Sequence, residues 1–234
     1  MREKLIKKAS SSLVAVIAML LLPIFIVAMK HPQQKKAYSY LALGDSYTIG
    51  EKVTQEENFP NQAVGMLREN GFDFASPKIV AKTGWTTDEL QAGIKKAKLE
   101  SHYDFVSLLV GVNNQYRQRT VADYILQFES LLDQALKFAR NNNNRVIVIS
   151  IPDWGITPFA NGRDREKIAS EIDEYNRANK EIADKYNVHY INITLGNRKA
   201  GAGKEMVTRD GLHPSGKEYY KWAAELAAVI KSEL

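Results

Sequence analysis

The sequence predicts an α/β protein in which helices cover both faces of a mainly parallel β-sheet. From residue 39 onward, five short apolar runs alternate with longer segments of helical periodicity. Strands that alternate with helices are joined by right-handed crossovers, which leave the strands parallel and place helices on both faces. The length of 234 residues is enough for one such domain and short for two.

The five predicted strands are apolar runs that end at turn-forming residues. The run at residues 105–110 is almost continuously apolar, which is typical of a parallel strand buried on both faces. The run at residues 145–151 is stopped by Pro152, which cannot donate to a sheet ladder. The predicted strands are residues 39–43, 78–81, 105–110, 145–151 and 188–193.

The intervening segments carry helical periodicity and helix-start signals. Asn58 is a suitable N-cap for the first helix, and Pro60 is tolerated in its first turn. In the third helix the apolar residues Val121, Ile125 and Phe128 lie on one stripe. The predicted helices are residues 59–69, 87–98, 121–140, 166–187 and 217–231.

The N-terminal segment is typical of an export signal. Four basic residues precede an apolar run of 17 residues at positions 13–29. A signal-peptide core has about 7–15 apolar residues and a spanning helix about 17–25, so the length slightly favours a retained anchor. We therefore expect a signal peptide or membrane anchor at 1–29, a linker at 30–38, and a folded domain at 39–234 that lies outside the cytoplasm, tethered or secreted.

Composition narrows the function classes. The formal net charge of +5 originates in residues 1–36, which hold seven Lys/Arg and one acidic residue. The rest of the chain holds 25 basic and 26 acidic residues, so it has no basic excess for a phosphate backbone, which argues against a nucleic-acid partner. The chain has no cysteine, which excludes disulfides and thiolate chemistry. No cluster with metal-ligand spacing is present, so neither a metal nor a cofactor is expected.

Three residues form a candidate nucleophilic set. Ser46 follows the first predicted strand, where the edge of the sheet opens to solvent. A serine hydroxyl needs a base to take its proton, and His213 is the candidate base. Asp210 lies three residues before His213, so one tight turn can present both side chains, with the carboxylate orienting the imidazole. Read alone, Ser46 fits a turn or a helix cap better than a nucleophile, and the segment from Asp210 to His213 fits an Asx-turn with a helix-capping histidine equally well.

Ends of the first three strands also supply candidate oxyanion donors. A tetrahedral oxyanion needs donors that are fixed before reaction. The side-chain amide of Asn113 follows the third strand, and Gly84 follows the second, where a missing side chain lets a backbone N–H approach substrate. The N–H of Ser46 is the third candidate. A turn asparagine or turn glycine is common singly, but three successive strands that each end in a suitable group are not.

These residues lie in four short segments that occur in one order along the chain: Gly44-Asp45-Ser46-Tyr47, Thr83-Gly84-Trp85, Gly111-Val112-Asn113-Asn114 and Asp210-Gly211-Leu212-His213-Pro214. In these segments the chain resembles the SGNH/GDSL hydrolase family over residues 39–234. The resemblance implies a three-layer α/β/α sandwich with a five-stranded, flavodoxin-like sheet and serine esterase activity. It implies Ser46 as nucleophile, His213 as base, Asp210 as its orienting residue, and Ser46, Gly84 and Asn113 as oxyanion donors.

Two positions depart from the family pattern. The third block usually reads Gly-x-Asn-Asp, so Asn114 stands in place of the usual aspartate and changes the local hydrogen bonding. Tyr47 replaces the common leucine, at a position not expected to do chemistry.

Several residues after strand ends are candidates for the substrate wall. Trp85, Tyr116 and Trp154, with Asn114 beside them, are the expected substrate-binding residues, and Phe159 lies in the same loop as Trp154. The more frequent fate of an aromatic side chain is core packing.

From these residues we expect a serine esterase that acts on carboxylic esters without a metal or cofactor. A lipase- or lysophospholipase-like acyl hydrolase would suit a membrane-tethered domain, and a polysaccharide O-deacetylase is the alternative enzyme. A non-catalytic glycan- or lipid-binding domain on the same fold is the alternative from another class. The expected partners are a small-molecule, lipid or glycan ester and, where the leader is retained, the membrane. Hydrolysis and acyl transfer both remain open at this point.

Overall fold

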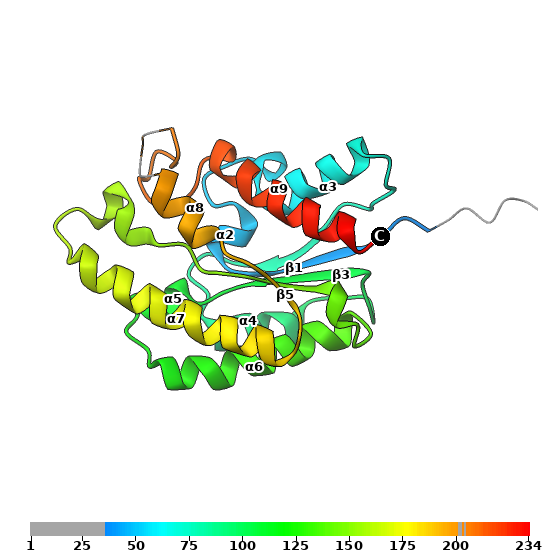
Figure 1. Ribbon diagram of the computed structural model, residues 1–234, viewed down its shortest axis with the longest axis horizontal. Helices are drawn as coiled ribbons and strands as arrows, with labels where there is room; N and C mark the ends of the chain where they lie inside the picture. Colours follow the sequence, from blue (N-terminus) through cyan, green and yellow to red (C-terminus); the bar gives the residue numbers. More distant parts are fainter. Residues whose placement is uncertain (1–35, 201–202, 204) are drawn as a thin grey trace, which may run out of the picture. The chain divides into compact units, whose positions relative to one another are not determined.

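Five parallel strands form the centre of the computed structural model, in the order β2-β1-β3-β4-β5 (Figure 1). This is the flavodoxin-like order, and it reverses direction between β1 and β3. The predicted α/β fold is therefore confirmed, with a sheet that is parallel throughout the described residues. The strands are β1 Tyr40–Gly44, β2 Lys78–Ala81, β3 Phe105–Leu109, β4 Val146–Ile149 and β5 His189–Ile191.

The structure describes residues 36–200, 203 and 205–234. The predicted signal or anchor at 1–29 and most of the predicted linker at 30–38 lie outside these residues. Tyr38, at the end of that linker, already joins the folded unit through an isolated bridge to Phe74. No helix within the described ranges has both the length and the apolar composition that a membrane crossing needs.

Helices cover both faces of the sheet. Figure 1 shows α3 and α9 on one face and α4, α6 and α7 on the other. The longer helices are α3 Phe59–Glu69, α4 Thr87–Lys96, α6 Val121–Phe138, α7 Arg165–Lys185, α8 Ile193–Ala200 and α9 Gly216–Ser232. The shorter ones are α2 Ser46–Ile49, α5 Val112–Tyr116 and the 3₁₀ turns η1 Gln55–Glu57, η2 Asn143–Arg145, η3 Trp154–Ile156 and η4 Pro158–Ala160.

Side-chain caps define where the long helices begin. The side chain of Asn58 accepts a hydrogen bond from the N–H of Asn61 at the start of α3. Thr120, Asp164 and Ser215 do the same for α6, α7 and α9. Each cap satisfies one of the backbone N–H groups that a helix start leaves without a partner, which stabilises the helix by about 1 kcal/mol.

Three helices were not predicted, and several boundaries differ by one to three residues. α2 and α5 have four and five residues, which is too short for a helical repeat to show in the sequence. α8 begins at Ile193, within the last predicted strand, which ends at Ile191 in the structure. The predicted strand at 145–151 is also shorter, because the chain leaves the sheet after Ile149.

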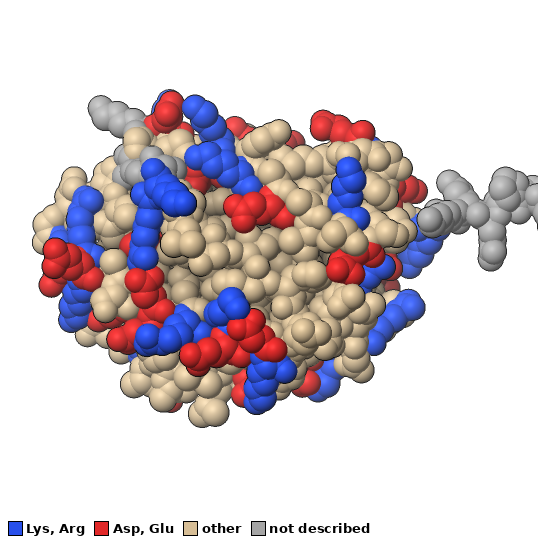
Figure 2. Space-filling view, in the orientation of Figure 1, with Lys and Arg blue, Asp and Glu red and all other residues tan. Residues whose placement is uncertain are grey.

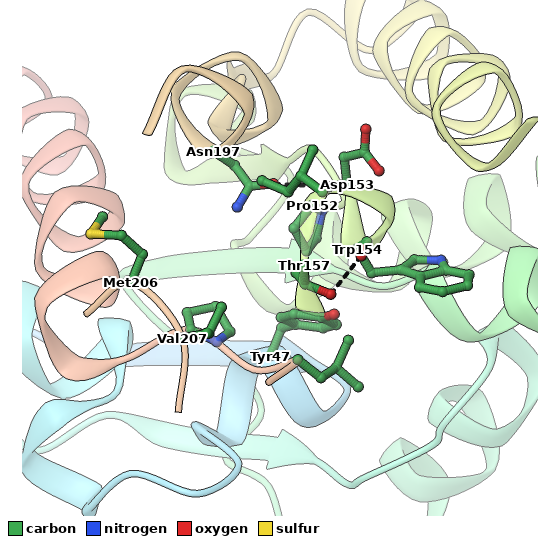
Figure 3. Close-up of a pocket in the computed structure, with 11 residues that line it drawn as sticks. Tyr47, Pro152, Asp153, Trp154, Thr157, Asn197, Met206 and Val207 are labelled. Carbon is green, nitrogen blue, oxygen red and sulfur yellow. Dashed lines mark hydrogen bonds between the residues drawn. The ribbon is translucent and has the colours of Figure 1, made fainter. Parts of the chain in front are cut away.

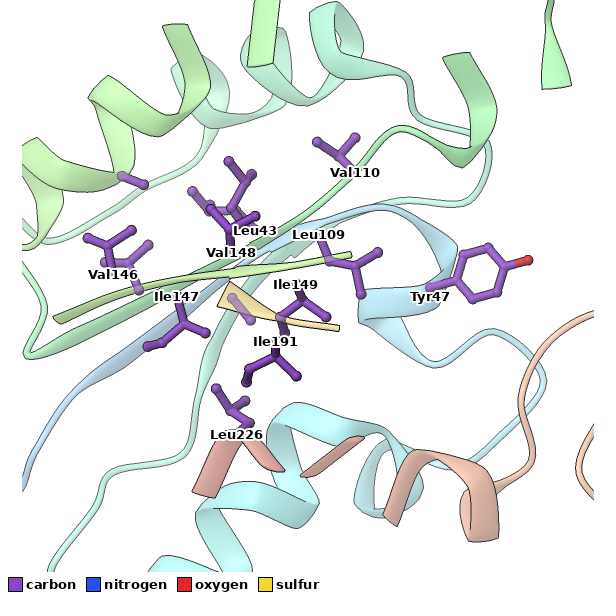
Figure 4. Packing of buried hydrophobic residues seen from close by; sticks show 14 of the residues in the cluster. Leu43, Tyr47, Leu109, Val110, Val146, Ile147, Val148, Ile149, Ile191 and Leu226 are labelled. Carbon is purple, nitrogen blue, oxygen red and sulfur yellow. The ribbon is translucent and has the colours of Figure 1, made fainter. Parts of the chain in front are cut away.

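The core lies on both faces of the sheet. Val146, Ile147 and Val148 of β4 are fully buried, as expected for a strand covered by helices on both sides (Figure 4). Figure 4 also shows Tyr47 beyond the end of the strands, with its hydroxyl group pointing away from this packing. Tyr47 thus stands at the edge of the sheet where the candidate site lies.

Candidate active site

The predicted catalytic and oxyanion residues lie together at the carboxyl edge of the sheet. Ser46 follows β1, Gly84 follows β2 and Asn113 follows β3, and all three line one pocket with His213. His213 arrives from the other end of the chain, in the turn that precedes α9. The pocket lies beside the point where the strand order reverses, which is where open α/β sheets bind ligands.

A sharp turn presents Ser46 at the first position of α2. Gly44 ends β1 and lies in close contact with α2 and with the end of β3. A Cβ there would lie 2.0 Å from Thr48 Oγ1 and 2.5 Å from the Leu109 carbonyl oxygen. Only glycine fits this approach. Asp45 then caps α2, because its Oδ1 accepts a hydrogen bond of 3.0 Å from the N–H of Tyr47.

The three residues of the nucleophilic set form a continuous hydrogen-bonded chain. His213 Nε2 lies 3.0 Å from Ser46 Oγ, and His213 Nδ1 lies 2.7 Å from Asp210 Oδ2. Ser46 and His213 are both buried, at 4% and 7% exposure. With Nδ1 protonated and donating to Asp210, the lone pair of Nε2 faces the serine hydroxyl. This is the geometry that lets an imidazole take the serine proton.

Asp210 is held by its own turn. One carboxylate oxygen, Oδ1, accepts hydrogen bonds from the N–H groups of Leu212 and His213 at 2.9 and 3.0 Å and from Thr208 Oγ1 at 2.8 Å. Burial raises the pKa of Asp210, but the hydrogen bonds from His213 and the turn outweigh it and lower the pKa to about 2. The group is therefore a carboxylate at neutral pH, with its second oxygen aimed at His213.

The backbone N–H groups of Ser46 and Gly84, two of the residues that line the pocket, have no hydrogen-bond partner within the described residues. Gly84 has a φ of +82°, in the left-handed region that favours glycine, and its carbonyl accepts from Arg117 Nη2 at 2.6 Å. This bond orients the peptide on its carbonyl side.

The side chain of Asn113 is held beside them. Its Nδ2 donates to the Trp85 carbonyl at 3.0 Å, and its contact with Asp45 Oδ2 at 3.4 Å is longer than usual for an N–H···O bond. Ser46, Gly84 and Asn113 all line the pocket, so the three candidate oxyanion donors belong to residues of one site.

The pocket has a volume of about 180 Å³ and a largely aromatic wall. Tyr116 and Trp154 lie in it as predicted, with ring centroids 5.4 Å apart, and Phe159 completes a cluster of three rings. The wall therefore comes from α5 and from the loop after β4. It also includes Tyr47 and Leu212, which the sequence did not identify as wall residues.

Two predicted substrate-binding residues lie elsewhere. The ring of Trp85 packs on α4, where a Cβ added to Gly93 would lie 2.2 Å from it, so the ring fills a gap in the helix surface. Asn114 is fully buried and its side chain bonds Thr87, accepting from the N–H and donating to the hydroxyl. Neither residue is among those that line the pocket.

Arg163 was missed by sequence reasoning. Its guanidinium lies 5.4–5.6 Å from the centroids of the Tyr116, Trp154 and Phe159 rings, so it backs the aromatic wall through cation–π contacts. Nothing in the local sequence pattern distinguishes this exposed arginine from its neighbours, and Figure 2 shows Lys and Arg interspersed with Asp and Glu over the face that it draws. Within the described residues, no group of three or more His, Asp or Glu is placed to hold a metal ion.

Comparison with solved structures shows that other proteins share this fold. The structure resembles that of a lipase/acylhydrolase from Enterococcus faecalis, with a TM-score of 0.68 and 22% identity over 84% of this chain and 97% of that one. It also resembles the acetylxylan esterase Axe2 from Geobacillus stearothermophilus, with a TM-score of 0.64 and 18% identity over 82% and 94% of the two chains. A third similar structure is the esterase EstA from a Pseudoalteromonas species, with a TM-score of 0.61 and 18% identity over 83% and 97%.

The class defined by the fold is thus the α/β/α sandwich that these solved structures share. The model of the GDSL-like lipase/acylhydrolase family matches residues 42–220, and the chain belongs to that family. A search of curated protein sequences found no match.

Proposed function

We propose that the protein is a serine ester hydrolase with Ser46 as nucleophile. Ser46 Oγ attacks the ester carbonyl while His213 Nε2 takes its proton. The carbonyl oxygen becomes an oxyanion that accepts from the N–H groups of Ser46 and Gly84 and from Asn113 Nδ2. His213 then protonates the leaving alcohol, and water repeats the sequence to release the acid and restore the serine hydroxyl.

The observation that carries this proposal is the chain of two hydrogen bonds through His213, at 3.0 Å to Ser46 Oγ and 2.7 Å to Asp210 Oδ2. A helix-capping role for His213 does not require hydrogen bonds to both a carboxylate and a buried serine that lies 167 residues away in the sequence. The N–H groups of Ser46 and Gly84, which have no hydrogen-bond partner in the part of the chain that the structure describes, supply donors that the transition state needs.

The size of the pocket supports an ester with a short acyl group. Its volume of about 180 Å³ is below the roughly 300 Å³ at which pockets begin to enclose drug-sized ligands. The short acyl group of an O-acylated glycan or small molecule fits this volume. The chain also shares its fold with an acetylxylan esterase.

A lipase- or lysophospholipase-like activity is the second candidate. Tyr116 and Phe159 at the pocket are 43% and 39% exposed, and such apolar rings can receive a lipid chain that lies partly outside the pocket. The predicted anchor at residues 1–29 would bring the domain to a membrane.

The test compares the hydrolysis of p-nitrophenyl acetate and octanoate by the wild-type protein and by Ser46→Ala. We expect the wild-type protein to hydrolyse acetate and the variant to lose at least about a thousandfold in kcat, because triads without the nucleophile lose several decades of rate. Ser130→Ala, which alters an exposed serine on α6, is the matched control and is expected to retain full activity.

Each result has a distinct meaning. Turnover that disappears only in Ser46→Ala supports the serine esterase, and a rate on octanoate well above that on acetate would favour the lipid candidate. Ester turnover that is equal in the wild-type protein and in Ser46→Ala would show that Ser46 is not the nucleophile. Binding of glycan or lipid without turnover would favour the non-catalytic alternative.

A further inference from the structure

Tyr47 separates the catalytic pocket from a small internal cavity. It follows Ser46 in α2, is only 3% exposed, and lines the pocket that contains Ser46 and His213. It also lines the cavity drawn in Figure 3, together with Pro152, Thr157 and Met206. Its ring therefore has the reacting atoms on one side and the cavity on the other.

The cavity offers almost no free space. Its volume is about 10 Å³, which is about the smallest space that can hold one water molecule. Tyr47, Trp154 and Leu212 line both spaces and together form the partition between them. The Tyr47 ring is fixed on its catalytic side by His213, whose ring centroid lies 5.3 Å away. A substrate group that meets this partition can go no further.

A second groove borders the catalytic pocket. That groove has a volume of about 290 Å³ and shares Tyr116 and Trp154 with the catalytic pocket. Apart from Ile168, its other lining residues are polar or charged and include Gln118, Arg163 and Lys167. A bulky alcohol such as a sugar fits toward this groove, whereas the cavity behind Tyr47 has a volume of only about 10 Å³, so the side of the pocket at Tyr47 suits the acyl group.

We propose that the ring of Tyr47 limits the length of the acyl chain that the enzyme accepts. This inference rests on the proposed serine esterase activity. The ring fills space that a leucine, the residue common at this position in the family, would leave open. The Tyr47 hydroxyl makes no hydrogen bond within the described residues, so the bulk of the ring and not its polar end is responsible.

The experiment measures kcat/KM on p-nitrophenyl esters from acetate to decanoate for the wild-type protein, Tyr47→Leu and Tyr47→Phe. We expect wild-type kcat/KM to peak at two to four acyl carbons. In Tyr47→Leu the ratio of octanoate to acetate should rise at least about tenfold, since each methylene accommodated in an apolar pocket is worth about 10-fold or more. Tyr47→Phe keeps the ring and should leave the ratio unchanged.

The ratio separates specificity from damage to the site. Loss of packing against His213 would slow both esters together and leave the ratio unaltered. An unchanged ratio in a folded Tyr47→Leu, with acetate turnover that still depends on Ser46, would overturn this inference and leave the esterase proposal standing. If Tyr47→Leu does not fold, the wild-type series decides: a peak at octanoate or beyond overturns the inference, and a peak at short esters supports it. Absence of any Ser46-dependent turnover would remove both proposals.

Discussion

A buried carboxyl group lies behind the nucleophile. Asp45 has no exposed surface, and its two oxygens face the N–H of Tyr47 at 3.0 Å and the amide of Asn113 at 3.4 Å. Burial raises the pKa of Asp45 to about 7, against hydrogen bonds that lower it. Asp45 thus connects the turn that carries Ser46 to a candidate oxyanion donor and titrates near neutrality.

The raised pKa of Asp45 predicts a pH-dependent stability. An unfolded aspartate has a pKa of 3.8, so between about pH 4 and pH 7 the folded protein holds a proton that the unfolded chain releases. The Asp45 contribution to the free energy of unfolding therefore decreases as pH rises through this window. Asp45→Asn cannot titrate and should lose this decrease.

Urea unfolding at both ends of that window checks the prediction. The wild-type protein should lose more stability between about pH 4.5 and pH 8 than Asp45→Asn does. Other titrating groups are shared by the two proteins, so they cancel in this comparison. Parallel pH profiles for the two proteins would show that Asp45 does not control the dependence.

The side chains of the candidate nucleophilic set were the part of the site that the sequence predicted best. Ser46, His213 and Asp210 could be singled out because a nucleophilic set needs these side-chain types, and the structure joins them by hydrogen bonds. The wall was less readable, because the direction of an aromatic ring depends on what packs against it. Trp85 and Trp154 both follow strand ends, yet Trp85 turns onto the gap at Gly93 while Trp154 turns toward the pocket.

Among the elements, the two helices beside the oxyanion residues are joined by Asn114. It sits in α5, and its Oδ1 accepts from the N–H of Thr87 in α4 at 3.1 Å while its Nδ2 donates to Thr87 Oγ1 at 2.7 Å. An aspartate could accept the first bond as well. The asparagine present here adds a donor, and the Thr87 hydroxyl also bonds Gln127 of α6.

Removing this link is expected to cost stability. Asn114→Ala leaves the buried N–H of Thr87 without its acceptor, which lowers the free energy of unfolding by about 1–3 kcal/mol. Chemical denaturation measures the loss. Asn144→Ala is the matched control, since Asn144 is exposed and its side chain makes no hydrogen bond within the described residues, and it should change stability by less than about 0.5 kcal/mol. A similar small effect at Asn114 would mean that water replaces its bonds.

Long helices were predictable and single-turn helices were not. α3, α6 and α7 show several helical turns and a recognisable cap, so their positions were predicted to within a few residues. α2 and α5 are single turns at the carboxyl edge, where the requirements of the site and not hydrophobic periodicity decide the backbone.

At the scale of the whole molecule, Arg198 of α8 joins three parts of the chain. Its Nε donates to Asp153 Oδ2 in the loop after β4 at 2.8 Å, and its Nη1 donates to Asp173 of α7 at 2.8 Å. The Asp153 side chain is only 2% exposed, while that of Arg198 is 28% exposed. The pair therefore holds α8 against the loop that supplies Trp154.

Loss of this guanidinium should destabilise the fold. Arg198→Met keeps the aliphatic stem but leaves the buried Asp153 carboxylate without its cation, at a cost of about 2–4 kcal/mol given the partial exposure of the pair. Thermal or urea unfolding reports the change. Arg177→Met on the exposed side of α7 is the control and is expected to have little effect. Equal stability of the two variants would contradict the prediction.

Sheet topology was only partly accessible from the sequence. Alternation of strands and helices predicted parallel strands and two helical layers. It did not by itself order the strands, because β1 is flanked by β2 and β3 through long-range contacts that no local pattern encodes. The flavodoxin-like order was implied only by the resemblance to the family in the four segments that carry it.

The proposed chemical groups and part of the aromatic wall come from different loops at the sheet edge, which has an evolutionary consequence. The proposed chemical groups come from the turns after β1, β2 and β3 and from the turn before α9, whereas Trp154 and Phe159 come from the loop between β4 and α7. That loop contributes none of the proposed reacting groups. Natural selection can therefore remodel it, and with it the range of esters accepted, while the reaction itself is inherited unchanged.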